Sequence, residues 1–412
     1  MLTRRGWAAV AAAASTWVVA RLIGSPDLHM MAVGILVLPL LALAFVRLSR
    51  PRLEVHRHLS TNRASLGSRV TVSVVVANHG RATTSFLLLE DAVPSALGRP
   101  ARQVVAGIPP RREQTVSYAL VCRQRGRYRI GPLTLYLTDP FGLARARFDA
   151  SGTTDLVVFP EVEELSAGGL VAQGAGAGEA AVRHLYRSAA DFYTMREYVT
   201  GDDLRRIHWP SVARTGTLMI RQDESTRRSS AILYLDTRKV ALGGHGSPGF
   251  ERGVSVAATL GRALSRAGFM LHLATVDSGA TPMNEETMLE TLAGATPSAT
   301  RSLAASLGRL RATTPSDTTV ALVTGPPLPG EVALIARAGS ALGRRIAVFV
   351  YPAPLSSLPA DAAAEFERRA SSARVSLQRA GWDVYVVNPD GRLASVWRRQ
   401  RHTKVPQAVP SS

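Results

Sequence analysis

Two long apolar runs open the chain and predict a membrane hairpin. The first covers about residues 7–23 and the second about residues 28–46, with the short polar turn 24–27 between them. Each run is close to the ~20 residues that a helix needs to cross a bilayer. Arg21 falls near the end of the first run, where a long side chain can reach the lipid headgroups. The pattern therefore predicts a transmembrane helical hairpin over residues 1–50.

Charged residues around the two runs predict their orientation. Arg4 and Arg5 precede the first run, and the turn between the runs carries only Asp27. The second run is followed by Arg47, Arg50, Arg52 and Arg57. The positive-inside rule then places the N-terminus and everything after residue 50 in the cytoplasm, as parts of a two-span protein of the cell membrane.

A cleaved signal peptide is the alternative interpretation of the N-terminus, because residues 3–7 loosely match a twin-arginine signal. The second apolar run directly downstream argues against export. Cys122 is the only cysteine, which excludes an intramolecular disulfide and fits a reducing compartment.

Short alternating segments separated by turns follow over residues 51–162. Residues 70–76 and 115–121 alternate between apolar and polar positions, and turn sequences recur between the segments. Short strands with a turn every ten or so residues are typical of an immunoglobulin-like β-sandwich. His56 and His58 share one face of a predicted strand, but no Cys, Asp or further His lies nearby in the sequence to complete a metal site, so we interpret them as surface residues.

Residues 163–190 are rich in glycine and alanine and predict a linker. A phosphate-binding loop at 174–178 is the alternative, but no strong strand precedes this stretch and no Gly-Lys-Ser/Thr follows it. After a block at residues 191–230, the pattern changes to alternating strands and helices over residues 231–400. Strands are predicted at 231–236, 269–276, 319–324, 345–351 and 382–387, and helices at 250–267, 285–311, 329–342 and 360–380.

This alternation predicts a mostly parallel sheet that is covered by helices on both faces. Asp236, Asp277 and Gly325 follow three of the strands and should lie at one edge of the sheet, where open sheets usually place their sites. Residues 401–412 predict a basic flexible tail.

A formal net charge of +18 raises nucleic acid as a partner. The basic residues are almost all arginine, however, with only Lys239 and Lys404 as lysines, a bias that fits the codon usage of a GC-rich genome. A surface that faces anionic membrane lipid explains the charge equally well. We therefore expect membrane lipid and no nucleic acid among the partners.

The block at residues 191–230, called the signature block below, mixes acidic, basic, aromatic and turn-forming residues. Gly201, with Asp202 or Asp203, forms a predicted turn that could cap a short helix beginning at residues 204–207. Two interpretations stay open. Ion pairs between arginines and carboxylates could clamp the block internally, with Trp209 as its apolar anchor. Alternatively the block is an exposed docking surface, since tryptophan and arginine are typical anchors of protein interfaces.

The signature block resembles a bacterial family known as domain of unknown function 58. The resemblance rests on Arg196-Glu197-Tyr198, Gly201-Asp202-Asp203, Arg206-Ile207-His208-Trp209, Ala213-Arg214 and Gly216-Thr217-Leu218. Pro210 departs from the family, which commonly has a basic residue after the tryptophan. The paired apolar runs, an Arg-Gly-x-Tyr sequence at 125–128 and an Asp-Pro-Phe-Gly-Leu sequence at 139–143 extend the resemblance over nearly the whole chain.

The resemblance implies a C-terminal domain like that of von Willebrand factor A, and genes that neighbour those of MoxR-type AAA+ ATPases and transglutaminase-like membrane proteins. Such domains often hold Mg²⁺ through Asp-x-Ser-x-Ser. Here the corresponding residues are Asp236, Arg238 and Val240, so we expect no metal and no cofactor.

These observations favour a membrane-anchored interaction or assembly protein without enzymatic activity, whose partner by resemblance is a MoxR-type ATPase. The expected docking residues are Arg196, Glu197, Tyr198, Gly201, Asp202, Asp203, Arg206, Trp209 and Arg214. One alternative is a hydrolase that uses Asp202, Asp203 and His208 for acid and base chemistry, although no nucleophile accompanies them. The other is a basic protein that binds lipid or nucleic-acid surfaces.

Overall fold

The structure is a computed structural model that describes residues 1–49, 52–105, 107–165, 193–198, 207–223, 229–316 and 318–404. The chain divides into two compact units, Met1–Pro160 and Glu161–Ser412. The break falls two residues before the predicted end of the β domain at residue 162.

The first unit begins with two antiparallel helices, α1 (Arg4–Ile23) and α2 (Pro26–Leu48). Both are long and apolar enough to span a membrane. Thr3 and Ser25 cap their N-termini with side-chain oxygens, and Gly24 ends α1 in the left-handed conformation (φ 76°) that glycine adopts without strain. The predicted helical hairpin is confirmed.

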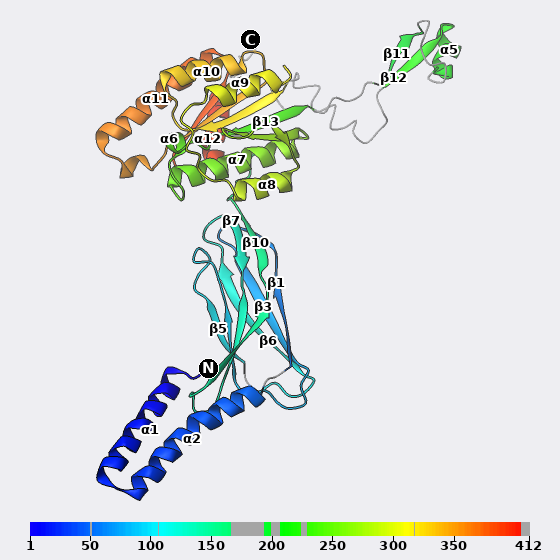
Figure 1. Ribbon diagram of the computed structural model, residues 1–412. Helices are drawn as coiled ribbons and strands as arrows, with labels where there is room; N and C mark the ends of the chain where they lie inside the picture. The colour runs from blue at the N-terminus through cyan, green and yellow to red at the C-terminus, as the bar shows by residue number, and fades with distance from the viewer. Residues whose placement is uncertain are drawn as a thin grey trace. The chain divides into compact units, whose positions relative to one another are not determined.

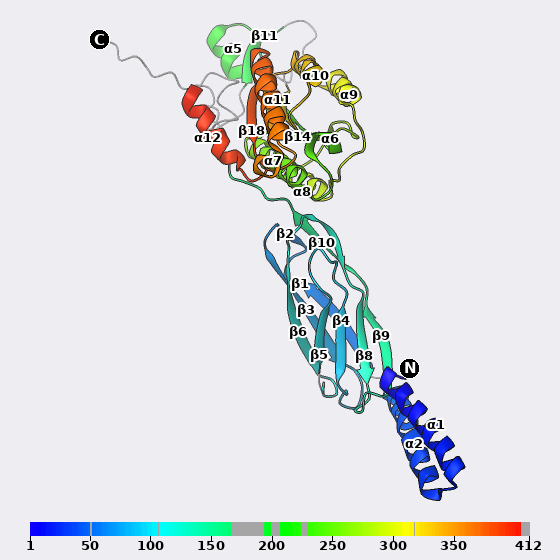
Figure 2. The ribbon, with the colours of Figure 1, turned by 90° about the vertical axis from the view of Figure 1, so that its left-hand side faces the viewer.

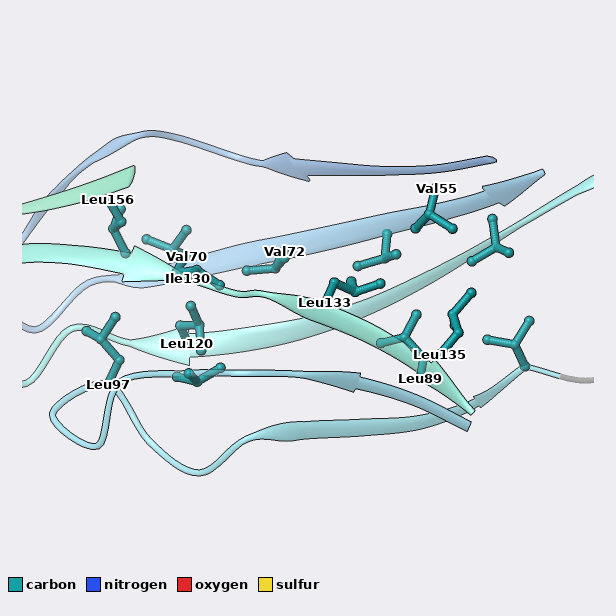
Figure 3. Close-up of a cluster of buried hydrophobic side chains, with 14 of the residues drawn as sticks. Val55, Val70, Val72, Leu89, Leu97, Leu120, Ile130, Leu133, Leu135 and Leu156 are labelled. Atoms are coloured by element: carbon teal, nitrogen blue, oxygen red, sulfur yellow. The ribbon is translucent and has the colours of Figure 1, made fainter. Parts of the chain in front are cut away.

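The rest of the first unit consists of β-sheets packed face to face (Figure 3). The first sheet has the antiparallel order β1-β3-β6, and the second has the antiparallel order β5-β4-β8-β9. A third, small sheet has the order β2-β10-β7. The strands are β1 (Leu53–Leu59), β2 (Arg63–Ser65), β3 (Arg69–Asn78), β4 (Leu87–Asp91), β5 (Ala101–Val105), β6 (Glu113–Val121), β7 (Gly126–Ile130), β8 (Leu133–Thr138), β9 (Arg145–Ser151) and β10 (Thr154–Phe159).

The alternation in β3 buries every second side chain between the sheets. Val70, Val72 and Val74 are fully buried there, and Leu89 and Leu135 of the second sheet complete the same core (Figure 3). Apolar burial of this kind supplies about 25 cal/mol per Å². The predicted β-sandwich is thus confirmed as packed antiparallel sheets, and His56 and His58 are exposed on β1 as expected.

One ion pair lies inside this sandwich, and the hydropathy pattern did not predict it. Arg57 on β1 donates to both carboxylate oxygens of Asp91, with Nε to Oδ2 at 2.9 Å and Nη2 to Oδ1 at 2.7 Å. Their side chains are 1% and 0% exposed. Arg57 also donates to the Ile130 and Gly152 carbonyls, and the Tyr118 hydroxyl donates to Asp91 at 2.6 Å. Burial, and then the bond to Asp91, raises the pKa of Tyr118.

The second unit contains a six-stranded sheet with the order β15-β14-β13-β16-β17-β18. All neighbouring strands are parallel except the short β15, which pairs antiparallel to β14. The strands are β13 (Ser230–Leu235), β14 (Met270–Thr275), β15 (Thr281–Pro282), β16 (Thr319–Thr324), β17 (Arg345–Val350) and β18 (Asp383–Val387). The prediction of a mostly parallel α/β sheet is confirmed.

Helices cover both faces of this sheet (Figure 1). One face carries α7 and α8, and the other carries α9, α10 and α11. The helices are α6 (Lys239–Leu242), α7 (Pro248–Arg266), α8 (Glu285–Ala293), α9 (Ala304–Thr313), α10 (Pro329–Gly339), α11 (Ala360–Arg379) and α12 (Leu393–Lys404), with a 3₁₀ turn η2 (Leu355–Ser357).

Two predictions for this unit were wrong in detail. The single helix expected over 285–311 is two helices, because Gly294 ends α8 and Pro297 follows three residues later. Residues 401–404, predicted as the start of a flexible tail, are the last turn of α12. Trp397 explains this, because it is 1% exposed and stacks on Tyr385 of β18 with 4.5 Å between ring centroids.

Glu163 and Glu164, predicted as the start of the linker, instead bond to helices of the α/β unit. The Glu163 carboxylate accepts hydrogen bonds from the backbone N–H groups of Leu393 and Ala394 at 3.2 and 2.9 Å, at the first turn of α12. It also accepts from Arg252 at 3.1 Å. A carboxylate at a helix N-terminus satisfies N–H groups that have no partner within the helix.

Glu163→Gln should therefore loosen α12. Losing a charge-assisted bond to the helix start costs about 1–2 kcal/mol, equivalent to a roughly tenfold faster hydrogen exchange in residues 393–404. Hydrogen exchange of the full-length protein, read by mass spectrometry, measures this. Glu164→Gln is the matched control, since the Glu164 side chain is 73% exposed and pairs with the exposed Arg266. Equal exchange in the two variants would contradict the prediction.

Candidate functional site

The described parts of the signature block form a two-stranded antiparallel sheet and a short helix (Figures 1 and 2). Strand β11 (Tyr193–Glu197) pairs antiparallel with β12 (Met219–Asp223), so that Arg196 lies opposite Ile220 and Glu197 opposite Met219. Helix α5 (Trp209–Thr215) precedes β12, and Gly216 ends it in the left-handed conformation with φ 70°. The two halves of the motif that are separate in sequence are thereby joined in one small element.

Two backbone hydrogen bonds bring residues from both halves to the start of β12. The N–H of Tyr198 donates to the Leu218 carbonyl at 2.8 Å, and the N–H of His208 donates to the Met219 carbonyl at 2.9 Å. Successive carbonyls of an extended strand point to opposite edges. Tyr198 and His208 therefore flank the start of β12 on its two sides.

The short helix that the structure describes starts at Trp209, outside the predicted range of residues 204–207. Ile207 makes a β-bridge, and α5 starts at Trp209 with Pro210 in its first turn. Proline suits this position because it has no N–H to leave unpaired. His208 is the N-cap residue but makes no side-chain cap hydrogen bond. The prediction that residues 204–207 begin a helix is therefore wrong for Ile207. Residues 202–206, with the predicted caps Asp202 and Asp203, lie outside the described residues.

The described docking candidates present most of their side chains to solvent. Trp209 is 66% exposed, Glu197 and Arg214 are exposed, and Tyr198 is half-buried. Trp209 is therefore not the buried anchor that the clamp interpretation expected. The backbone of Arg196 lies in β11, and nothing further is described of its side chain. Gly201, Asp202, Asp203 and Arg206 lie outside the described residues.

The hydrolase alternative depends largely on residues of the same undescribed segment. Asp202 and Asp203 belong to it, whereas His208 is half-buried at the start of α5. Among the described residues, no cluster of three or more His, Cys, Asp or Glu side chains could hold a metal ion.

A second group of polar side chains lies where the central strands of the parallel sheet end. Asp236 follows β13 and is fully buried, and Arg238 two residues later has a 2% exposed side chain. Arg238 Nη2 donates to Asp236 Oδ2 at 2.8 Å, Nε donates to Oδ1 at 2.9 Å, and Nη1 donates to Glu331 Oε1 at 2.5 Å. Thr324, the last residue of β16, donates its hydroxyl to Asp236 Oδ2 at 2.7 Å.

This cluster does not fit a divalent cation. A guanidinium contacts both oxygens of Asp236, in the space where a metal would need them as ligands. Burial works to lower the pKa of Arg238, but the bonds to Asp236 and Glu331 outweigh it and raise that pKa, so the charge is permanent. The resemblance showed that Arg238 replaces a serine of the metal-binding motif, but it did not predict that the Arg238 guanidinium would itself pair with Asp236 in place of a cation.

Asp277 and Gly325, the other two residues predicted at this edge of the sheet, also contact neighbouring loops. Asp277 Oδ1 accepts hydrogen bonds from the hydroxyls of Ser298 and Thr300 at 3.0 and 3.1 Å. Gly325 lies against the Ala241 carbonyl so closely that a Cβ would overlap it. The expectation that these strand ends meet at one edge is met, and the contacts there hold loops together.

The fold and these sites define a protein with two N-terminal apolar helices, packed antiparallel sheets and a mostly parallel α/β unit that contains the signature block. Residues 194–382 match the family described as protein of unknown function DUF58, and the chain thus carries a DUF58 family domain over these residues. A search of curated proteins found no match.

Solved structures resemble parts of the chain only weakly. A CARDB domain from Pyrococcus furiosus is 16% identical over 26% of this chain and 88% of its own, with a TM-score of 0.21. The alkylpurine DNA glycosylase AlkC of Pseudomonas fluorescens is 15% identical over 34% of this chain and 42% of its own, with a TM-score of 0.18. A β-glucosidase from Listeria innocua is 15% identical over 25% and 16%, with a TM-score of 0.16. At these values the likenesses say nothing about function.

Proposed function

We propose that this protein is a membrane-anchored, non-enzymatic interaction protein that presents its signature block to a cytoplasmic protein partner. The observation that carries the proposal is the exposure of Trp209, which is 66% accessible at the start of α5. A large aromatic side chain in water is a common anchor of protein interfaces.

Neighbouring charges in the block support the same role. Glu197 and Arg214 are exposed on β11 and α5, so a partner would meet an aromatic ring and charges of both signs in one small element. Such an arrangement gives orientation and specificity in addition to apolar contact. The backbone pairing of β11 with β12 holds these residues in one element before a partner arrives, which lowers the entropy lost on binding.

Anchoring and topology extend the proposal. The two apolar helices would hold the protein in the cell membrane, and the arginines on both sides of the hairpin favour a cytoplasmic location for its ends. By family resemblance, the partner is a MoxR-type AAA+ ATPase, with a transglutaminase-like membrane protein as a second candidate. The process that they serve together would be the assembly or remodelling of other proteins.

The test is crosslinked affinity purification of the full-length protein from native membranes. We expect the wild type to recover an AAA+ ATPase and the Arg196→Ala/Trp209→Ala variant to lose at least about tenfold of it, because truncating interface anchors costs more than about 1.4 kcal/mol. Arg374→Ala/Val375→Ala on α11 is the matched control, since it also removes one arginine and one exposed apolar side chain.

The folded state of each variant is checked by its hydrogen exchange in the α/β unit. Loss of the ATPase from a variant that exchanges like the wild type supports docking. An unchanged set of recovered proteins, or a variant that is unfolded, would instead favour the clamp interpretation. An ester or peptide hydrolysis activity of the full-length protein that His208→Ala abolishes would show that the protein is an enzyme.

A further inference from the structure

One end of the β-sandwich exposes large aromatic side chains that take no part in its core. Phe86 is 70% exposed and Phe141 is 69% exposed. Leu87 pairs with Leu137 in the antiparallel pair of β4 and β8. Phe86 therefore precedes the start of β4, and the turn containing Phe141 follows the end of β8, at the same end of the sheet. Single exposed apolar residues are common on protein surfaces, but two phenylalanines at one end mark a surface that contacts something.

This end of the sandwich is bonded directly to the start of the first apolar helix. Leu143 accepts a hydrogen bond from the Thr3 N–H at 2.9 Å, and the Arg145 N–H donates to the Met1 carbonyl at 2.8 Å. The Thr3 hydroxyl donates to the Gly142 carbonyl at 2.6 Å. Phe141 is therefore held close to the point at which α1 begins.

A buried carboxylate fixes the turn that carries Phe141. Asp139 is 4% exposed, and its Oδ2 accepts from the Phe141 N–H at 2.9 Å while its Oδ1 accepts from the Ala144 N–H at 2.5 Å. Ala144 in turn packs against Ala42 and Val46 of α2. The turn is thus braced from both sides, and the exposed ring of Phe141 is not a consequence of a loose loop.

Arginines surround the two phenylalanines at the same end. Arg47, Arg52, Arg81, Arg111 and Arg112 are all exposed there. Backbone bonds bring three of them together, because Asn78 bonds to Arg111 and Arg112, and the His79 N–H donates to the Arg52 carbonyl. The exposed carboxylates at this end of the described residues are Glu54 and Glu113, and Glu54 is bonded by His56 and His79. The surface is therefore positively charged.

We propose that this end of the sandwich, with Phe86 and Phe141 among the five arginines, is a binding surface for anionic phospholipid. The phenyl rings would enter the headgroup region, and the arginines would bind lipid phosphates. Charge complementarity and the direct bonds to the first apolar helix both favour a lipid surface over a protein as the occupant. The surface lies in the first unit, so the proposal is independent of the signature block and its partner.

The test uses the full-length protein in nanodiscs of phosphatidylcholine, with or without phosphatidylglycerol. An environment-sensitive fluorophore is attached at Phe86→Cys or Phe141→Cys, and quenching by spin-labelled lipid is measured. Leu66→Cys is the matched control, because Leu66 is a 38% exposed apolar residue at the opposite end of the sandwich. Cys122 is buried, and the labelled parent chain checks that it stays unreactive.

We expect labels at positions 86 and 141, but not 66, to be quenched in discs with phosphatidylglycerol. Arg81→Gln/Arg112→Gln should lower the ratio of docked to undocked label about fivefold for each arginine, the equivalent of about 1 kcal/mol per basic side chain at an anionic surface. Arg69→Gln/Arg123→Gln, two exposed arginines at the opposite end, should have no effect.

Three results would overturn the proposal. Labels at 86 and 141 could be as accessible to water as the label at 66 in discs of both compositions. Quenching could be equal with and without phosphatidylglycerol, which would show that the surface does not select anionic headgroups. The labels could also be shielded in native membranes but not in protein-free lipid, which would make the occupant a protein.

Discussion

Replacing Arg57 by alanine is expected to destabilise the β-sandwich by about 3–5 kcal/mol, because it leaves the fully buried carboxylate of Asp91 without its cation. Tyr118 would then be the one remaining side-chain donor to Asp91 among the hydrogen bonds described. The Ile130 and Gly152 carbonyls would also lose a donor. This one guanidinium joins strands of all three sheets, namely β1, β4 and β7, and the loop before β10, so its loss should affect the whole sandwich.

Hydrogen exchange of the full-length protein measures the effect in the sandwich alone. A loss of 3–5 kcal/mol corresponds to at least about a hundredfold faster exchange in the peptides of β3, β4 and β8. Arg129→Ala is the matched control, since the Arg129 and Asp155 side chains are 81% and 80% exposed and 3.6 Å apart, a geometry that contributes about 0–1 kcal/mol.

A double variant separates the cost of an unpaired charge from the cost of lost packing. Arg57→Met/Asp91→Leu removes both charges and should recover part of the stability lost in Arg57→Ala. The recovery should be incomplete, because the carbonyls that Arg57 satisfies stay without a donor. A double variant as unstable as the sum of the single ones would contradict this explanation.

Arg238→Met should destabilise the α/β unit by a similar amount, about 3–5 kcal/mol. Asp236 is fully buried and would keep the Thr324 hydroxyl and the backbone N–H of residue 238 as donors, but no positive charge. Glu331 would lose its ion-pair partner as well and keep the Leu328 N–H as a donor. Because the strand ends meet here, the loops after β13 and β16 should exchange hydrogen first.

Magnesium distinguishes an internal cation from an occupied metal site. Since the Arg238 guanidinium contacts both oxygens of Asp236, neither Mg²⁺ nor a chelator should change exchange in β13 and β16 of the wild type. Stabilisation of the wild type by Mg²⁺ would show that the cluster binds metal. The control variant is Arg368→Met on α11, whose pair with Glu365 is exposed and should change stability by at most about 0.5 kcal/mol.

Prediction from the sequence succeeded for elements whose apolar positions repeat regularly along one segment of the chain. The apolar runs of α1 and α2 and the alternation of β3 each specify an element on their own. Strands β2, β4 and β5 were not predicted, because they are short and their side-chain pattern is weak, and the alternating strand β9 was also missed. Their place is decided by pairing, as when Leu87–Asp91 pairs with strands on both of its edges.

In the signature block, too, the local sequence predicted one property and only the tertiary structure decided another. Its residues were recognised from their order, but the order could not distinguish a clamp from a docking surface. The structure decides only the burial of Trp209, whose 66% exposure depends on how α5 and β12 fold together. Glu163 is a similar case, since no local pattern connects it with the helix that starts 230 residues later at Leu393.

The sequence by itself determined the order of the parts, namely the apolar hairpin, the β domain, the signature block and the alternating α/β unit, because hydrophobic periodicity is a local property. Only the tertiary structure decided which charges are buried and with what partner. Arg57 with Asp91, Arg238 with Asp236 and Glu331, and Asp139 at the Phe141 turn are long-range or loop contacts. The free energy of a charge depends on its surroundings, and those form only when distant segments pack together.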